Sequence, residues 1–326
     1  MWRSSKRIWA VALLTGTEGL RQPAFFLLFA LAAGLTAFSP GFAFFHLGEE
    51  AKMVADLGLS TILMCATLLA LLTASSTVSD EIEGRTALTM LAKPLRRTEF
   101  LLGKYFGIVL SSGALVLLAS VVLLATLRSQ RYEPAQDPLF AVGIASGLAI
   151  GLVLFGGFLV TRLMAGRGLS LVSGFWLAYA AASAFVLIFL ARSSAAWEWR
   201  MVAGLFFIFL HTCVIAAAAV ALATRCTLVQ AALGTAVFFL VGHASGALVA
   251  PFRDSSHHLS LAGTLLRAIL PDLDQFNVAD ALATGFLDKP VTIPWDVLCG
   301  SSLYALLYGG ALLVLATLLF QRRELG

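Results

Sequence analysis

Long apolar runs dominate the chain, and eight of them have the length that a helix needs to cross a bilayer, about 20 residues each. A single packed soluble core cannot account for so many runs of this length. The pattern therefore predicts an all-α polytopic membrane protein with about eight transmembrane helices, which form one transmembrane domain over residues 1–326. The predicted spans are residues 23–44, 57–78, 104–127, 138–161, 169–191, 201–223, 227–250 and 297–320.

The N-terminus, MWRSSKRIWAVALLTGTEGLRQ, has basic residues ahead of a short apolar stretch, as a signal peptide does. No A-x-A cleavage site follows it, and its apolar residues recur near helical spacing instead. We therefore expect residues 1–22 to form an interfacial helix, with Arg3, Lys6 and Arg7 facing lipid headgroups. The recurring residues are Ile8, Trp9, Ala12, Leu13, Gly16 and Leu20.

The composition supports a membrane protein and the charges predict its orientation. Of the 326 residues 60% are apolar and 12% are charged, against about 25% charged in ordinary soluble domains. With both termini inside, the inner connections hold 14 of the 22 Lys and Arg residues, so the positive-inside rule places both termini in the cytoplasm. Residues 251–296 then form an extracytoplasmic segment, whose apolar patches LSLAGTLLRAIL and VADALATGFL predict short helices lying on the outer face.

Few residues point to chemistry inside the predicted spans. None of the eight contains Asp or Glu, and only His211 and His243 are ionisable at depth. Either these two histidines form a proton relay or ligand pair, or they share a neutral interhelical hydrogen bond, which we expect. His257 and His258 are interpreted as solvated loop residues, not metal ligands. The glycine series Gly143, Gly147, Gly151 and Gly242, Gly246 predict close helix packing, within one chain or between subunits.

No motif predicts catalysis or cofactor binding. The chain has no GxxxxGK[ST] phosphate-binding loop, and no Ser/His/Asp or paired-carboxylate arrangement can be defended from spacing. The four cysteines are far apart and lack CxxC spacing, which argues against a metal or redox site; three are expected in the membrane and Cys299 at the interface. We therefore expect no enzyme activity, no metal, no cofactor and no nucleic-acid binding.

One charged island interrupts the apolar pattern, between the second and third spans. Ser79 to Gly107 holds four acids and five bases, and its topology is cytoplasmic. Three of its acids, Asp80, Glu81 and Glu83, favour a helix start, and apolar residues then recur in a stripe that Pro94 interrupts. Such a run could be a solvated loop that only obeys the positive-inside rule. The acids, the stripe and the proline instead favour an amphipathic helix on the inner face; the stripe is Ile82, Ala87, Leu88, Leu91 and Leu95.

The island resembles the cytoplasmic signature of ABC-2-type transporter permeases, in which an acidic pair precedes Gly-Thr or Lys-Thr, two apolar residues, Pro, Arg and Gly-Lys. EIEGRTALTMLAKPLRRTEFLLGK carries these features, and Arg85 stands where many members carry glycine. The C-terminal stretch FQRRELG and the outer-segment stretch LPDLDQFNV are also similar to this family. The resemblance covers the first three and last three spans, and spans four and five look like an addition. Matching positions are Glu81, Glu83, Thr86, Met90, Leu91, Pro94, Arg97, Gly103 and Lys104.

The resemblance implies that residues 79–104 are a coupling segment, which docks on a separate ATP-hydrolysing subunit. It further implies a permease homodimer in the cytoplasmic (inner) membrane of a bacterium, in contact with membrane lipids, with ATP bound by the partner subunit. A non-transporting subunit that transmits ATPase work to an extracytoplasmic partner is an alternative, and a proton-coupled carrier using His211 and His243 is a third. The expected coupling residues are Asp80, Glu81, Glu83, Arg85, Thr86, Leu91, Pro94, Arg96, Arg97, Gly103 and Lys104.

Overall fold

The computed structural model describes residues 2–42, 50–79, 96–129, 198–252, 260–278, 282 and 293–321. Throughout these residues the regular structure is helical, which confirms the expected all-α class. Predicted spans four and five and the tip of the outer segment, including His257 and His258, lie outside the described residues. The long helices are α1 (Trp2–Arg21), α2 (Pro23–Phe42), α3 (Glu50–Ala74), α6 (Arg97–Ser129), α9 (Glu198–Ala223), α10 (Leu228–Val249) and α13 (Trp295–Gln321).

Among the described residues, five helices are long and apolar enough to cross a membrane. They start in α3, α6, α9, α10 and α13, and each coincides with a predicted span. The helices α1 and α2 meet at an angle of 63° and pass the same test only as a pair, which raises the number to six. Proline lacks a backbone N–H and fits the first position of a helix, so Pro23 explains why the chain breaks there.

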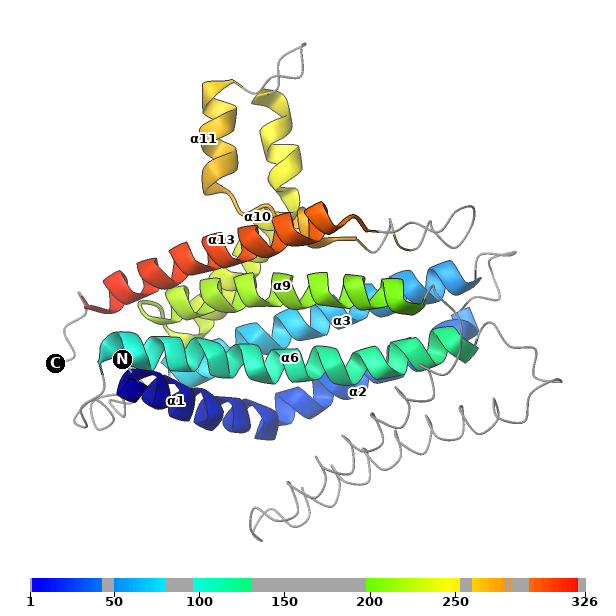
Figure 1. Ribbon diagram of the computed structural model, residues 1–326, viewed down its shortest axis with the longest axis horizontal. Helices are drawn as coiled ribbons and strands as arrows, with labels where there is room; N and C mark the ends of the chain where they lie inside the picture. Colours follow the sequence, from blue (N-terminus) through cyan, green and yellow to red (C-terminus); the bar gives the residue numbers. More distant parts are fainter. Residues whose placement is uncertain are drawn as a thin grey trace, which may run out of the picture.

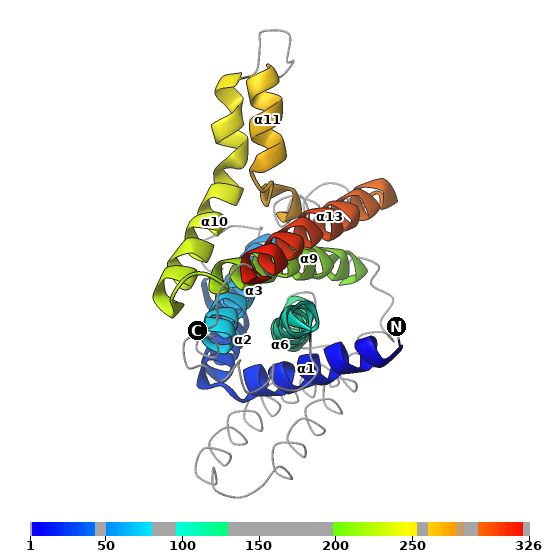
Figure 2. The ribbon, with the colours of Figure 1, turned by 90° about the vertical axis from the view of Figure 1, so that its left-hand side faces the viewer.

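The helices pack as a bundle around α3, α6 and α9 (Figure 1). Helices α1 and α2 cover one side of α6, and α10 and α13 lie against α9 on the other side (Figure 2). The main apolar core joins α2, α3, α6 and α9 through side chains that are almost wholly inaccessible. It includes Ala32, Val54, Ile62, Leu69, Leu115, Ala119 and Leu123.

The two ends of the described chain lie at the same end of the bundle. Figure 1 shows the N-terminus beside the start of α6, with the C-terminal end of α13 nearby. Two contacts support this arrangement, because Glu99 of α6 meets Ser4 of α1 and Arg97 of α6 meets Gln321 of α13. The shared end agrees with an even number of spans.

A thiol-accessibility measurement tests the orientation. Ser129 ends α6 and the exposed Thr227 precedes α10, at opposite ends of the bundle. In a cysteine-free background, Ser129→Cys is expected to react with an impermeant thiol reagent from outside intact cells, and Thr227→Cys only after lysis, because basic connections stay inside. Labelling of Thr227→Cys in intact cells would reverse the predicted orientation.

The predicted outer segment begins with a short helix and a strap. Helix α11 (Leu261–Ile269) starts at Ser260, whose Oγ accepts a hydrogen bond from the Gly263 N–H at 3.2 Å. Together with the C-terminal part of α10 it projects from the bundle (Figures 1 and 2). The first predicted surface helix is therefore present as a helix, with Leu261 and Ile269 82% and 72% exposed. Residues 270–278, called the strap below, return the chain to the bundle.

Candidate coupling site

The coupling residues fall into two groups. Asp80, Glu81, Glu83, Arg85, Thr86, Leu91 and Pro94 lie outside the described residues, so their helix stays a prediction. The structure describes both flanks of this stretch: Ser79, where α3 ends, and the four residues Arg96, Arg97, Gly103 and Lys104 at the start of α6. Helix α6 begins at Arg97, seven residues before the predicted span, so the third span carries its charged start with it.

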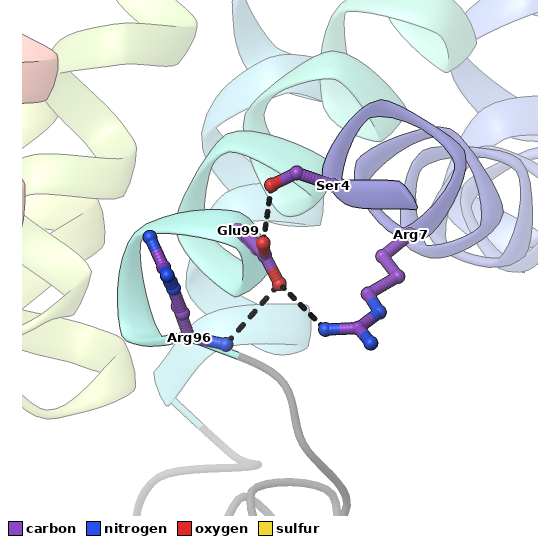
Figure 3. A network of polar contacts seen from close by, with 4 residues as sticks. All are labelled: Ser4, Arg7, Arg96 and Glu99. Atoms are coloured by element: carbon purple, nitrogen blue, oxygen red, sulfur yellow. Dashed lines mark hydrogen bonds and ion pairs between the residues drawn. The ribbon is translucent and has the colours of Figure 1, made fainter. Parts of the chain in front are cut away.

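Glu99 joins the start of α6 to α1 (Figure 3). Its side chain is only 6% exposed, and its carboxylate accepts hydrogen bonds from the Ser4 hydroxyl and, at 3.2 Å, from the Arg96 backbone N–H. The Arg7 guanidinium lies 3.9 Å from the same carboxylate. A carboxylate in the first turn of a helix also favours the positive end of the helix dipole. Glu99 therefore has every neighbour that a buried negative charge requires.

Arg97 joins the start of α6 to the end of α13. Its Nη1 donates hydrogen bonds to the carbonyl oxygens of Phe320 and Gln321, at 3.0 and 3.1 Å. These carbonyls belong to the last turn of α13, where backbone acceptors lack helical partners and attract cations. The guanidinium also lies 5.6 Å from the centre of the Phe320 ring, which stacks on Phe100. A residue expected at a docking surface thus holds two membrane helices together.

Gly103 has a packing role, because α1 passes directly over it. A Cβ atom there would lie 2.6 Å from the Cβ of Val11 and 3.1 Å from the backbone oxygen of Ile8. Gly107, one turn further along α6, has the same relation to α1, with the Ala12 backbone oxygen 2.8 Å from an added Cβ. Glycines at this spacing allow two helix backbones to approach closely. They explain why α1 lies against α6 along its whole length.

Lys104 is buried, although a docking charge would be expected on the surface. Its side chain is 2% exposed, and its Nζ lies 5.7 Å from the centre of the Phe100 ring. An ammonium over an aromatic face is stabilised by the quadrupole of the ring. In this structure Lys104 therefore supports the start of α6 from within.

The N-terminal flank of the predicted coupling segment is also fixed by contacts with other helices. Helix α3 ends in a π-helical turn, Ser75–Ser79, that lies against α9 and α10. The Gln22 side chain, at the bend between α1 and α2, donates a hydrogen bond of 3.1 Å to Ser76 Oγ in this turn. Residues 80–95 are thus connected at both ends to helices whose positions are fixed by packing.

Glu99, Ser4 and the pairing of Arg7 are the functional contacts that sequence reasoning missed. Arg7 was expected to face headgroups, and instead it approaches Glu99. The missed signal was an acid in the first turn of α6, two residues after Arg97, together with Gly103 and Gly107 at helical spacing. The prediction for α1 is also wrong in part, because the predicted apolar residues do not share one environment. Ala12 and Gly16 face the bundle, together with Thr15 and Gly19, while Trp9 and Leu13 are exposed.

The histidine pair is close in space but is not hydrogen-bonded across the helices. The rings of His211 (α9) and His243 (α10) are 5.4 Å apart, so the two side chains lie at one level of the bundle. The expected interhelical hydrogen bond is wrong, because His243 Nδ1 bonds the Phe239 carbonyl of its own helix at 3.1 Å and His211 has no partner. No group of three metal-ligand side chains occurs within the described residues.

The predicted glycine contact in α10 also differs in detail. Gly242 faces the Leu273 side chain of the strap, 2.4 Å from where a Cβ would stand, and not another helix backbone. Gly246 has no atom within 4 Å of such a Cβ. Of the cysteines, Cys65 is buried, Cys213 and Cys226 are partly buried, and Cys299 is exposed near the start of α13. Cys226 lies in the turn between α9 and α10 and not within a span.

Comparison of the chain with protein-family profiles gives no match. Comparison with curated proteins gives no match either. The case for a function therefore rests on the residues and contacts described above.

Proposed function

We propose that this chain is the membrane-spanning subunit of an ABC-2-type transporter, and that residues 79–104 couple it to a separate ATPase. The observation that supports this most is the fixation of both flanks of the coupling segment. One flank is the π-helical turn at Ser75–Ser79, and the other is the first turn of α6 around Glu99. A docking element must be stiffly joined to the spans if it is to move them.

The contacts at the start of α6 connect the coupling segment to other helices of the bundle. Glu99 connects it to α1, and Arg97 connects it to the end of α13. A displacement of the α6 N-terminus would therefore be passed to helices on both sides of the bundle. Nucleotide-driven closure of an ATPase can shift the permease only through differential contacts with its two states. We expect the segment between Ser79 and Arg96 to make those contacts, because both of its flanks are joined to the bundle.

The sequence supports a separate source of energy. It holds no phosphate-binding loop, so the ATP must be bound by another chain. The coupling segment combines acids at its start with bases after Pro94, and such a charge pattern can fix the register of docking. Within the proposal, the subunit moves its substrate across the bacterial cytoplasmic membrane as one of two permease copies.

Charge reversal in the coupling segment tests this proposal. Truncation of Glu83 to alanine would change ATPase binding too little to measure, because an exposed ion pair contributes only about 0.2–1 kcal/mol. Glu83→Arg places a like charge against a basic docking partner, at a cost of several kcal/mol, and Leu91→Asp puts a carboxylate in the apolar stripe. Both variants are expected to elute as the parent does in detergent, but to lose co-purification with the proposed partner ATPase.

Asp274→Arg is the matched control, since it reverses an exposed acid on the opposite predicted face. Parental ATPase binding by both Glu83→Arg and Leu91→Asp would show that residues 79–104 are an ordinary loop. Substrate movement per ATP in reconstituted vesicles then separates a transporter from a subunit that only transmits force. ATPase binding without movement of any lipid or peptide probe would favour the second.

A further inference from the structure

A histidine without partners is buried beneath the strap that follows α11. His211 of α9 is 0% exposed, and neither of its ring nitrogens has a hydrogen-bond partner. The rings of Phe239 and Phe276 present edges to it, at 5.7 and 6.2 Å. A buried polar group without a partner is costly and in native proteins calls for an explanation. Neither the coupling site nor the proposed transport function uses this side chain.

His243 supplies a second ring with a fixed tautomer. Its Nδ1 lies 3.1 Å from the Phe239 carbonyl oxygen, which can only accept, so Nδ1 carries the proton. In the neutral ring the other nitrogen, Nε2, is therefore an acceptor. The two imidazoles are 5.4 Å apart and inclined by 59°. Two nitrogen acceptors, one on each ring, thus lie in a single apolar cluster.

The strap, residues 270–278, closes this cluster. Leu273 and Phe276 are 0% and 1% exposed, and Phe276 contacts His211 directly. Three hydrogen bonds hold the strap and the end of α11: Leu273 N–H to the Gly242 carbonyl at 3.2 Å, Asp272 N–H to the Tyr304 hydroxyl at 2.8 Å, and the Tyr308 hydroxyl to the Ile269 carbonyl at 3.0 Å. The strap is thus attached to both α10 and α13, and it separates the histidines from the predicted outer side.

Other titratable groups lie on the elements that pack against α9 or close the cluster. They are Cys65 on α3, Tyr105 on α6, Asp272 and Asp274 on the strap, and Tyr304 and Tyr308 on α13. Asp272 is engaged by Arg267 at 3.9 Å, and Asp274 is exposed. None of these groups hydrogen-bonds His211. The cluster therefore contains no carboxylate bonded to His211 that could neutralise a charge on it.

We propose that His211 and His243 form a proton-binding pair that acts as a latch, so that protonation from the outer side unseats the strap. With the strap seated, a charged imidazole would lie among Phe239, Phe276 and aliphatic side chains without solvation. With the strap lifted, water reaches the rings and the charge is solvated. Protonation therefore favours the open strap. This inference does not rest on the proposed function, because it requires no ATPase.

The expected pH dependence follows from proton linkage. A solvated imidazole has an ordinary pKa of about 6.5. If only the open form binds the proton, the seated strap is stable above that pH and loses stability as the pH falls below it. The opening constant is then expected to rise by up to about tenfold for each pH unit below 6.5.

Thiol labelling measures this opening. In a cysteine-free background, Leu273→Cys reports the buried strap position and Asp274→Cys supplies an exposed reference that corrects for thiol ionisation. The ratio of their labelling rates is expected to rise at least about fivefold between pH 6.5 and pH 5.5. His211→Phe and His243→Gln, which cannot take the proton, are expected to flatten that rise. A ratio that is constant or falls on acidification overturns the proposal, as does a rise that persists in both variants.

Tyr304→Phe is the matched control for a merely structural effect. It removes the acceptor of the Asp272 N–H. It is therefore expected to raise the opening constant of the strap by the same factor at every pH and to leave the pH dependence of that constant unchanged. Hydrogen–deuterium exchange of residues 270–278 in the unmodified chain, corrected for the intrinsic rate, gives the same readout without the Leu273 substitution. Exchange protection that is independent of pH would also contradict the latch.

Discussion

Gly107→Ala is expected to lower the free energy of unfolding by about 1–3 kcal/mol, the usual cost of forcing an extra methyl group into a packed interface. The added Cβ would lie 2.5 Å from the Cβ of Thr15 and 2.8 Å from the Ala12 backbone oxygen. A side chain could rotate away, but the backbone of α1 can move only as a whole helix. The substitution should therefore separate α1 from α6.

Gly246→Ala is the matched control for Gly107→Ala, because it makes the same change where no atom lies within 4 Å. Alanine favours a helix over glycine by about 1 kcal/mol, so this variant is expected to be neutral or slightly more stable. The apparent melting temperature in detergent should thus move in opposite directions for the two variants. If Gly107→Ala melts at or above the parental temperature, α1 does not pack on α6 as described.

The helices of the bundle could be predicted from hydropathy because their cause is local. In a bilayer, a run of about 20 apolar residues satisfies its own backbone hydrogen bonds only as a helix. Each described span therefore matches its prediction within a few residues at most ends. The starts of α3 and α6 are exceptions, because each helix begins seven residues before its predicted span. At the start of α6, Arg97 and Glu99 are charged, and a hydropathy window excludes them. In the structure Arg97 bonds the Phe320 and Gln321 carbonyl oxygens, and Glu99 bonds Ser4 and the Arg96 N–H.

Tertiary contacts explain the features that could not be predicted. The amphipathic pattern of α1 shows that one face is apolar, but not whether lipid or another helix covers it. Glycines on both partners decide this, and Gly16 and Gly19 of α1 meet Leu110 and Ser111 of α6. Such pairs become visible only when two segments about 90 residues apart are brought together.

The contacts of the histidine pair also could not be predicted from the sequence. The structure places the rings of His211 and His243 5.4 Å apart. The sequence alone showed only that the two residues lie in consecutive predicted spans. It could not show that the Phe239 carbonyl would engage His243, which leaves His211 without a partner. Nor could it show that Phe276, 65 residues further along the chain, would cover His211.

Glu99→Lys is expected to reduce stability by about 3 kcal/mol or more, the range found when one member of a buried charge network is removed. Lysine there would face the Arg7 guanidinium, the Arg96 N–H and the positive end of the α6 dipole at once. Glu99→Gln keeps an acceptor for Ser4 and Arg96, and should cost about 1 kcal/mol through loss of the charge. Ser4→Ala should cost a similar amount.

The double reversal Arg7→Glu with Glu99→Lys separates the parts of this network. It restores opposite charges between α1 and α6, so it should recover the Arg7 contribution alone. The helix dipole and the Arg96 N–H still require an acceptor at position 99, and rescue should therefore be partial. Melting temperatures of the four proteins in this cycle give the coupling energy directly. Full additivity of the two substitutions would show that Arg7 and Glu99 do not interact, and that the α6 N-terminus is held to α1 by Ser4 and the glycine contacts alone.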